Sequence, residues 1–236
     1  MSAAGLLSVA DLSVHIGGSR ILDRVTFAVP GSGVTVLLGR NGVGKTTTLR
    51  AILGLLPSTG SVTFDGVPVA GEPTHRLVQR GLGYVPEDRC VFSGLTVAEN
   101  LRLAERSDPP RYDDVFDLFP ELAKRSRQRA GTLSGGQQQM LAIGRVLLND
   151  NRLLLVDEPT KGLAPRVVAE VAEALARVAE RVPILLVEQN LAVVRRLGGD
   201  AVVLAAGRVA WTGAAAELLG DAALTRSTLG VGVGLA

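Results

Sequence analysis

The sequence predicts an α/β fold with a mainly parallel sheet around a phosphate-binding loop, an antiparallel β subdomain near the N-terminus and a helical subdomain in the middle. Three observations lead to this prediction. Apolar runs of strand length alternate with segments of helical periodicity through much of the chain. A glycine-rich stretch ending in Lys45-Thr46 follows one of these runs. Residues 88–150 carry helical patterns with no strand-like run between them.

Length and composition indicate one globular domain. The chain of 236 residues can bury a sizeable core, and we place the domain over residues 6–230. Hydrophobic residues make up 47% and charged residues 20%, which argues against disorder. We expect the glycine-rich end from Ser227 onward to fray, with residues 231–236 as a flexible tail. Cys90 is the one cysteine, which excludes an intrachain disulfide and suits a reducing cytoplasm.

Charge and hydropathy narrow the classes of function. The net charge of +2 and the aromatic content of 3% give little support to nucleic-acid binding, since few rings are available for base stacking. No apolar run approaches the roughly 20 residues that a bilayer crossing needs. The segment Met1–Ala10 lacks the basic start of a secretory signal. We therefore expect a chain that is soluble by itself, with any membrane component supplied by another polypeptide.

The first elements are expected to be antiparallel strands. Residues 6–35 alternate between apolar and polar side chains and carry a turn signal at Gly17-Gly18. The segment Ser61–Val69 has the same character around Asp65-Gly66. Together they predict a β layer separate from the parallel sheet.

Buried strands and helices then alternate. Val34–Leu38 is an apolar run bounded by glycines, and a helix is expected over Thr46–Leu55. Apolar residues recur at spacings of three and four in Arg166–Arg181, which predicts an amphipathic helix. The further predicted strands are Leu82–Val85, Leu153–Asp157, Ile184–Glu188 and Val202–Leu204, and the helices of the insertion are Thr96–Glu105, Asp113–Leu122 and Ser134–Leu148.

The glycine-rich stretch fits the pattern G-x-x-x-x-G-K-[ST] of a P-loop. Glycines let backbone N–H groups wrap a triphosphate, and the following helix adds its positive N-terminal dipole. Lys45 would meet the β- and γ-phosphates, and the Thr46 hydroxyl would meet Mg²⁺. The residues predicted to bind ATP here are Gly39, Arg40, Asn41, Gly42, Val43, Gly44, Lys45, Thr46 and Thr47.

Two carboxylates follow the strand Leu153–Asp157. Because ligands bind at the carboxyl edge of parallel sheets, this edge is where Asp157 and Glu158 are expected to act. Asp157 would hold Mg²⁺, and Glu158 would polarise the attacking water. A strand ending in Asp-Glu is common by itself. Here the Asp-Glu pair follows the P-loop lysine, Lys45, by 112 residues (157 − 45), and this combination of motifs makes the signal specific.

The string Leu133–Gln137 has two compatible interpretations. Ser134 is suited to cap a helix, and Gly135-Gly136 would loosen its first turn. A helix N-terminus with a serine and two glycines also presents free N–H groups to an anion. The sequence alone leaves open whether this is only a cap or also a phosphate contact.

Taken together, these motifs resemble the ATP-binding subunits of ATP-binding cassette (ABC) transporters, over about Leu6–Leu219. The resemblance implies that two subunits enclose two ATP molecules. By this resemblance, the signature motif, which binds the γ-phosphate held by the other subunit, corresponds to Ser134, Gly135, Gly136 and Gln137. The strings Val85-Pro86-Glu87, Glu158–Pro165 and Val187–Asn190 are similar to the LivF type of branched-chain amino-acid importer ATPases.

Four positions depart from the commonest ABC residues. Ile16 stands where an aromatic ring covers adenine, and Glu87 stands where a glutamine meets Mg²⁺. Gln189 replaces the switch histidine and can donate a hydrogen bond but cannot carry a proton. Ala164 replaces the aspartate of the cross-subunit loop. These departures fit either a degenerate site or a branch-specific active one. The presence of the motif residues favours activity, with Lys45, Glu158 and Gln189 as catalytic residues and Thr46, Glu87 and Asp157 around the metal.

The resemblance implies an importer ATPase that uses ATP and Mg²⁺ and works at the inner face of the cell membrane. Its implied partners are a second ATPase subunit (identical or related), integral membrane permease subunits and, indirectly, an extracytoplasmic solute-binding protein, with no nucleic acid. Arg89, Phe92 and Leu95 are candidates for docking the permease, or they pack within the helical insertion. An ABC ATPase of translation or DNA repair, a regulatory subunit without turnover and an exporter ATPase remain alternatives.

Overall fold

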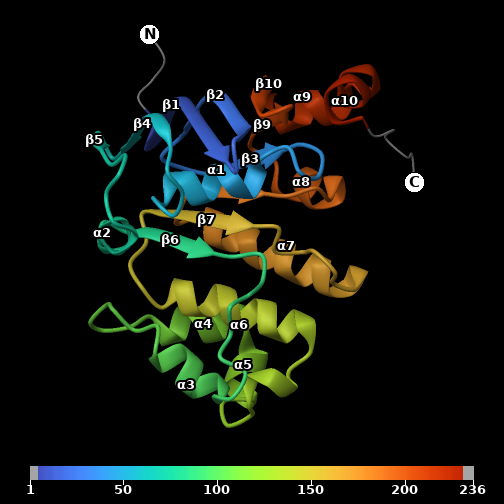
Figure 1. Cartoon of the computed structure of the whole chain (residues 1–236). Helices are drawn as coiled ribbons and strands as arrows, with labels where there is room; N and C mark the ends of the chain where they lie inside the picture. Colours follow the sequence, from blue (N-terminus) through green and yellow to red (C-terminus); the bar gives the residue numbers. More distant parts are fainter. Residues whose placement is uncertain (1–4, 231–236) are drawn as a thin grey trace.

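The larger of two sheets carries the parallel strands. The computed structural model describes residues 5–230 and is shown in Figure 1. Six strands lie in the order β10-β9-β3-β8-β7-β6, and every neighbouring pair except β9–β10 is parallel. The mainly parallel sheet is thus confirmed. The strands are β3 (Val34–Leu38), β6 (Leu82–Val85), β7 (Leu153–Asp157), β8 (Ile184–Val187), β9 (Asp200–Ala205) and β10 (Arg208–Ala214).

The second sheet has four antiparallel strands in the order β2-β1-β4-β5, as the alternation near the N-terminus predicted. Its strands are β1 (Leu7–Ile16), β2 (Ser19–Val29), β4 (Thr59–Phe64) and β5 (Val67–Pro68). Asp65 and Gly66 both have positive φ, 51° and 74°, which is the backbone of a tight hairpin turn. This short turn joins β4 directly to β5.

Helix α1 (Lys45–Ile52) lies between the two sheets (Figure 1). Leu49 and Ile52 belong to one buried cluster with residues of both sheets, including Leu37 of β3. The next residue along β3, Leu38, belongs to the cluster on the opposite face. Because successive side chains of a strand point to opposite faces, a continuous apolar strand such as β3 can serve two cores at once. The glycine loop before α1 is thereby held between rigid layers.

Helices α6 (Gly135–Leu147), α7 (Pro165–Ala179) and α8 (Leu191–Leu197) pack on the other side of the parallel sheet. Along α7 the apolar residues Val171, Leu175 and Val178 are buried, which confirms the amphipathic helix predicted from their spacing. The helices α2 (Thr74–Gln79), α8 and α9 (Ala215–Gly220) were not predicted. Each has only six or seven residues, too few for a helical period to stand out.

The insertion is helical, with α3 (Val97–Arg102), α4 (Tyr112–Leu118), α5 (Pro120–Lys124), a 3₁₀ turn (Ala130–Thr132) and α6. The prediction of one helix over Asp113–Leu122 is wrong, because the chain breaks between α4 and α5. Phe119 leaves the helical region with φ −132° and ψ 68°, and Pro120 starts the next helix. A proline disfavours helical backbone at the residue before it, which explains the break.

The C-terminal part departs from expectation as well. Residues 227–229 do not fray but complete α10 (Ala222–Leu229), whose first turn is capped by Asp221. Leu229 is buried, and Gly230 ends the helix in the left-handed conformation with φ 67°. The predicted tail, 231–236, lies outside the described residues. No helix within residues 5–230 is both long and apolar enough to cross a membrane.

Candidate functional site

The glycine loop joins β3 to α1 and needs glycine at two points. Gly39 has φ 149°, and a Cβ there would overlap the carbonyl oxygen of Leu204 on β9. Gly44 has φ 106°, and a Cβ there would overlap the side chain of Leu22 on β2. The loop therefore packs closely against both sheets, and its backbone conformation requires glycine at these two positions.

Lys45 is the first residue of α1 and is 4% exposed. Its Nζ donates to the carbonyl oxygens of Gly39 at 2.9 Å and Arg40 at 3.1 Å, so the side chain turns back over the loop that precedes it. Burial lowers the pKa of Lys45, while the nearby Glu158 carboxylate acts in the opposite direction. A cation is thus held at the point where the loop would receive phosphates.

Thr46 and Asp157 face each other at the end of β7. The Thr46 hydroxyl donates to Asp157 Oδ1 at 3.1 Å. Asp157 is fully buried, and its other oxygen, Oδ2, has no hydrogen-bond partner among the described residues. Burial, the largest influence, raises the pKa of Asp157 to about 6. An orphaned carboxylate oxygen beside a hydroxyl is a set of hard oxygen donors, which fits Mg²⁺.

Glu158 is held by three side chains. Its backbone is strained, with φ 43°, and its N–H donates to Val187 O at the end of β8 at 2.9 Å. The Gln189 amide Nε2 donates to Glu158 Oε1. Lys45 Nζ lies 3.6 Å from Oε1, and Lys161 Nζ lies 3.4 Å from Oε2. The carboxylate is therefore placed between the loops that follow β3, β7 and β8.

Glu87 reaches the same edge of the sheet from β6. Its carboxylate forms an ion pair with Lys161, which also contacts Glu158. The Glu87 charge is one of the influences that raise the pKa of Asp157, although burial is larger. Lys161 is a neighbour of the site to which the sequence analysis gave no role. A lysine directly after the Glu158-Pro159-Thr160 string was the signal for it.

A cavity of about 220 Å³ opens beside the glycine loop. Its lining includes Gly39, Arg40 and Asn41 of the loop together with Gln189 and Leu191. Ile16, at the end of β1, is 47% exposed. The structure thus brings the loop residues 39–47 together with Asp157, Glu158 and Gln189, and it leaves Ile16 as an exposed apolar side chain.

The Ser134–Gln137 segment forms the start of α6. Ser134 Oγ accepts from the Gln137 N–H at 3.3 Å, and the Ser134 N–H donates to Gln137 Oε1 at 3.0 Å, a reciprocal capping box. Gly136 packs against Val167 of α7, where a Cβ would collide. No hydrogen bond or ion pair in the described part of the chain joins this segment to the glycine loop. In the described part of a single chain, the predicted signature residues are therefore not linked to the P-loop by any polar contact.

The segment after Glu87 is held by two buried or half-buried side chains. Asn100 is fully buried and binds both the N–H and the carbonyl of Phe92. The Arg145 guanidinium lies 4.9 Å from the centre of the Phe92 ring, which remains 48% exposed. Arg89 donates to Gln138 of α6 at 3.4 Å, and Leu95 is half-buried. The segment is ordered by the helical insertion and still presents an aromatic ring.

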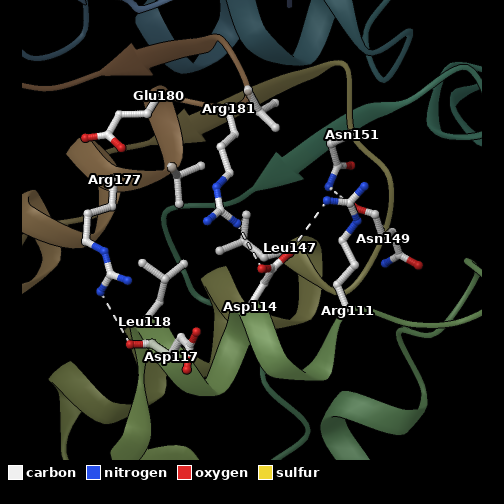
Figure 2. Close-up of a pocket in the computed structure, with 12 residues that line it drawn as sticks. Arg111, Asp114, Asp117, Leu118, Leu147, Asn149, Asn151, Arg177, Glu180 and Arg181 are labelled. Atoms are coloured by element: carbon white, nitrogen blue, oxygen red, sulfur yellow. Dashed lines mark hydrogen bonds and ion pairs between the residues drawn. The ribbon is translucent and has the colours of Figure 1, made fainter.

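A second cavity, of about 210 Å³, lies between α4 and the end of α7 (Figure 2). Arg181 Nη1 lies 2.9 Å from Asp114 Oδ1, and Arg111 pairs with both Asp114 and Asp150. Among its lining residues, Arg111 and Arg181 both pair with Asp114, and no residue of the glycine loop lines the cavity. The Arg181–Asp114 pair joins the helical insertion to the residues that follow α7.

Loop, helix and carboxylates together define a nucleoside-triphosphate-binding α/β protein. A family profile described as ABC transporter matches residues 22–161. The chain therefore belongs to the ABC family, and it is an ATP-binding subunit and ATPase of that family.

Relatives resemble the chain over nearly its whole length. It is 38% identical over 232 residues to the high-affinity branched-chain amino acid transport ATP-binding protein BraG of Pseudomonas aeruginosa, covering 95% of this chain and 100% of the relative. It is 35% identical over 234 residues to the probable branched-chain amino acid transport ATP-binding protein LivF of Archaeoglobus fulgidus, covering 96% and 99%. The predicted resemblance to this group is thus confirmed.

An ATP-binding protein named for the import of a different solute is also similar. The molybdenum import ATP-binding protein ModC of Rhizobium johnstonii is 38% identical over 200 residues, covering 79% of this chain and 56% of the relative. Among solved structures, an ATP-binding subunit of an ABC transporter superposes with a TM-score of 0.80 at 28% identity, covering 94% of this chain and 95% of that one. These findings establish the family and its fold.

Proposed function

We propose that this chain hydrolyses ATP to drive an importer of branched-chain amino acids or related small polar solutes through separate permease subunits. The observation that carries the proposal is the convergence of Lys45, Thr46, Asp157 and Glu158 at one sheet edge. The two relatives named for branched-chain amino acid transport support the substrate class, since both align over nearly the full chain. Because the chain is also similar to a molybdenum import ATP-binding protein, we propose a class of solutes and not a single one.

In the proposed reaction, the loop residues 39–47 hold the triphosphate and Lys45 neutralises its β- and γ-phosphates. Thr46 and Asp157, which face each other, would hold Mg²⁺, and Glu87 would lie at the edge of that site. Mg²⁺ supplies charge neutralisation at the phosphate oxygens. Glu158 orients the attacking water and accepts its proton, and Gln189 donates a hydrogen bond toward the γ-phosphate. Ile16 covers the adenine by apolar contact.

A second ATPase subunit, identical or related, completes the site. The start of α6, where Ser134 is exposed, would bind the γ-phosphate that the other subunit holds, through Ser134, Gly135, Gly136 and Gln137. ATP thereby joins two subunits, and hydrolysis separates them. This closing and opening is transmitted to the permease, for which the exposed Phe92 segment is the proposed contact. The subunit would act on the cytoplasmic face of the membrane. A solute-binding protein on the opposite face would be an indirect partner.

A phosphate-release assay on the purified chain, with Lys45→Ala beside it, tests hydrolysis. Turnover that is lost in the variant supports an ATPase site. Absence of turnover in the wild-type chain, with ATP still bound, would instead support a regulatory subunit. Co-purification from membranes, followed by ligand binding to the associated solute-binding protein, tests the importer and its solute. Recovery of an exporter permease would overturn the importer.

A further inference from the structure

Glu188, at the end of β8, is a buried carboxylate that the proposed reaction does not use. It is 3% exposed. Burying a carboxylate is unfavourable unless hydrogen bonds replace its water. Here they do: Oε2 accepts from the Thr160 hydroxyl at 2.7 Å, and Oε1 accepts from the N–H groups of Gln189 at 2.8 Å and Asn190 at 2.9 Å.

These three donors come from two loops that meet at the site. Thr160 lies two residues after Glu158, in the loop between β7 and α7, and is 5% exposed. Gln189 and Asn190 lie in the loop between β8 and α8, and the Asn190 side chain accepts from Ala192 N–H to start α8. The Glu188 carboxylate therefore fixes the backbone of one loop against the hydroxyl of the other.

The side chain of Gln189 starts from this fixed backbone and ends on Glu158. Its own amide Nε2 donates to Glu158 Oε1, and no second anchor for that amide occurs among the described residues. Glu188 is almost fully buried, so it has little surface with which to touch a nucleotide directly. Hydrogen bonds to charged groups are the stronger kind, so this link is well suited to hold a short loop still.

We propose that Glu188 and Thr160 form a positioning pair that sets Gln189 against the catalytic carboxylate Glu158. The inference rests on the proposed ATPase function and adds to it a role for two residues that the proposed reaction does not use. The pair acts through Gln189. Loosening it lowers the rate of hydrolysis and leaves ATP binding by the glycine loop intact, because a small misplacement of a catalytic group affects the chemical step most.

Thr160→Val tests this with little change of shape, and Thr160→Ser is the matched control that keeps the hydroxyl. We expect Thr160→Val to lower kcat about tenfold, the scale of one lost hydrogen bond to a charged group. The Kd for a fluorescent ATP analogue should stay within about twofold, and Thr160→Ser should behave as the wild type. A drop in both variants, or in neither, would overturn the proposal.

The double variant with Gln189→Ala separates positioning from general damage. If the pair acts through Gln189, Thr160→Val adds no further loss of kcat in the Gln189→Ala background. Multiplied losses would show a structural effect and overturn the inference. Amide hydrogen exchange at residues 189–190 should quicken in Thr160→Val alone, and unchanged exchange would also overturn it. Hydrogen exchange needs no turnover, so it tests the contact between Thr160 and Glu188 even in an inactive chain. A lack of ATPase activity in the wild-type chain would refute only the proposed function.

Discussion

Lys45 Nζ lies 3.6 Å from Glu158 Oε1, and the two side chains are only 4% and 8% exposed. A buried ammonium and carboxylate at this distance offset much of each other's desolvation. The lysine has no other carboxylate within ion-pair distance in the described part of the chain. ATP phosphates at the loop would therefore compete with Glu158 for Lys45, so nucleotide binding and the position of the Glu158 carboxylate are linked.

Lys45→Ala should weaken ATP binding about 10- to 100-fold, the expected loss for a charge-assisted contact. Isothermal titration calorimetry with ATP measures it. Lys124→Ala is the control, because that lysine is 70% exposed and its one ion pair among the described residues is with Glu121 on the helical insertion. Equal affinities for the two variants would remove Lys45 from the phosphate site.

Glu158→Gln should lower kcat by about 10²- to 10⁴-fold without weakening ATP binding, because the variant removes the charge that competes with ATP for Lys45. Glutamine keeps the shape and a hydrogen-bond acceptor for Gln189, but it is a far weaker base. Single-turnover phosphate release and nucleotide titration measure the two quantities. Glu180→Gln, an exposed carboxylate at the end of α7, is the matched control. Unchanged turnover in Glu158→Gln would exclude Glu158 as the catalytic carboxylate.

The sequence was informative where a pattern is local. β3, β7 and β8 were predicted because an apolar run of strand length needs no distant partner to be recognised. The P-loop context was predicted for the same reason, and the strand–loop–helix is confirmed in β3 and α1. The break at Pro120 was a local signal that the helical pattern around it concealed.

The remaining features depend on distant parts of the chain. The Thr160–Glu188 hydrogen bond joins residues 28 positions apart, and each looks ordinary in its own segment. Lys161 became a neighbour of Glu87 only when β6 and β7 paired. The role of Ser134 depends on a second subunit, so it remains a prediction that this single chain does not test.

Ser134→Ala should lower ATP hydrolysis beyond its effect on stability. Losing the cap of α6 should lower the free energy of unfolding by about 1 kcal/mol. Thr96→Ala is a matched control, because Thr96 and Glu99 form the same capping box at α3. Both variants should lose similar stability in urea titrations, while only Ser134→Ala loses turnover and ATP-dependent dimer formation in sedimentation. Equal turnover would leave Ser134 as a helix cap alone.

Asp23 on β2 and Arg208 on β10 join the two sheets, with Arg208 Nε 2.8 Å from Asp23 Oδ2. The hydrogen bond from Arg208, the largest influence, holds the pKa of Asp23 below its usual 3.8. A carboxyl with a depressed folded pKa stabilises the fold above its unfolded pKa, and this contribution is lost as the pH falls through the folded value.

Asp23→Asn should therefore have a lower melting temperature than the wild type at pH 7. The gap should narrow below about pH 4, where the carboxyl becomes protonated in the unfolded chain, and it should close as the pH falls through the lower folded pKa. Asp11→Asn is the control, because Asp11 is exposed and has no ion pair in the described part of the chain. It should leave the melting temperature unchanged both at pH 7 and below pH 4. A gap that stays constant from pH 7 to acid would show that the charge of Asp23 contributes nothing to the joint between the sheets.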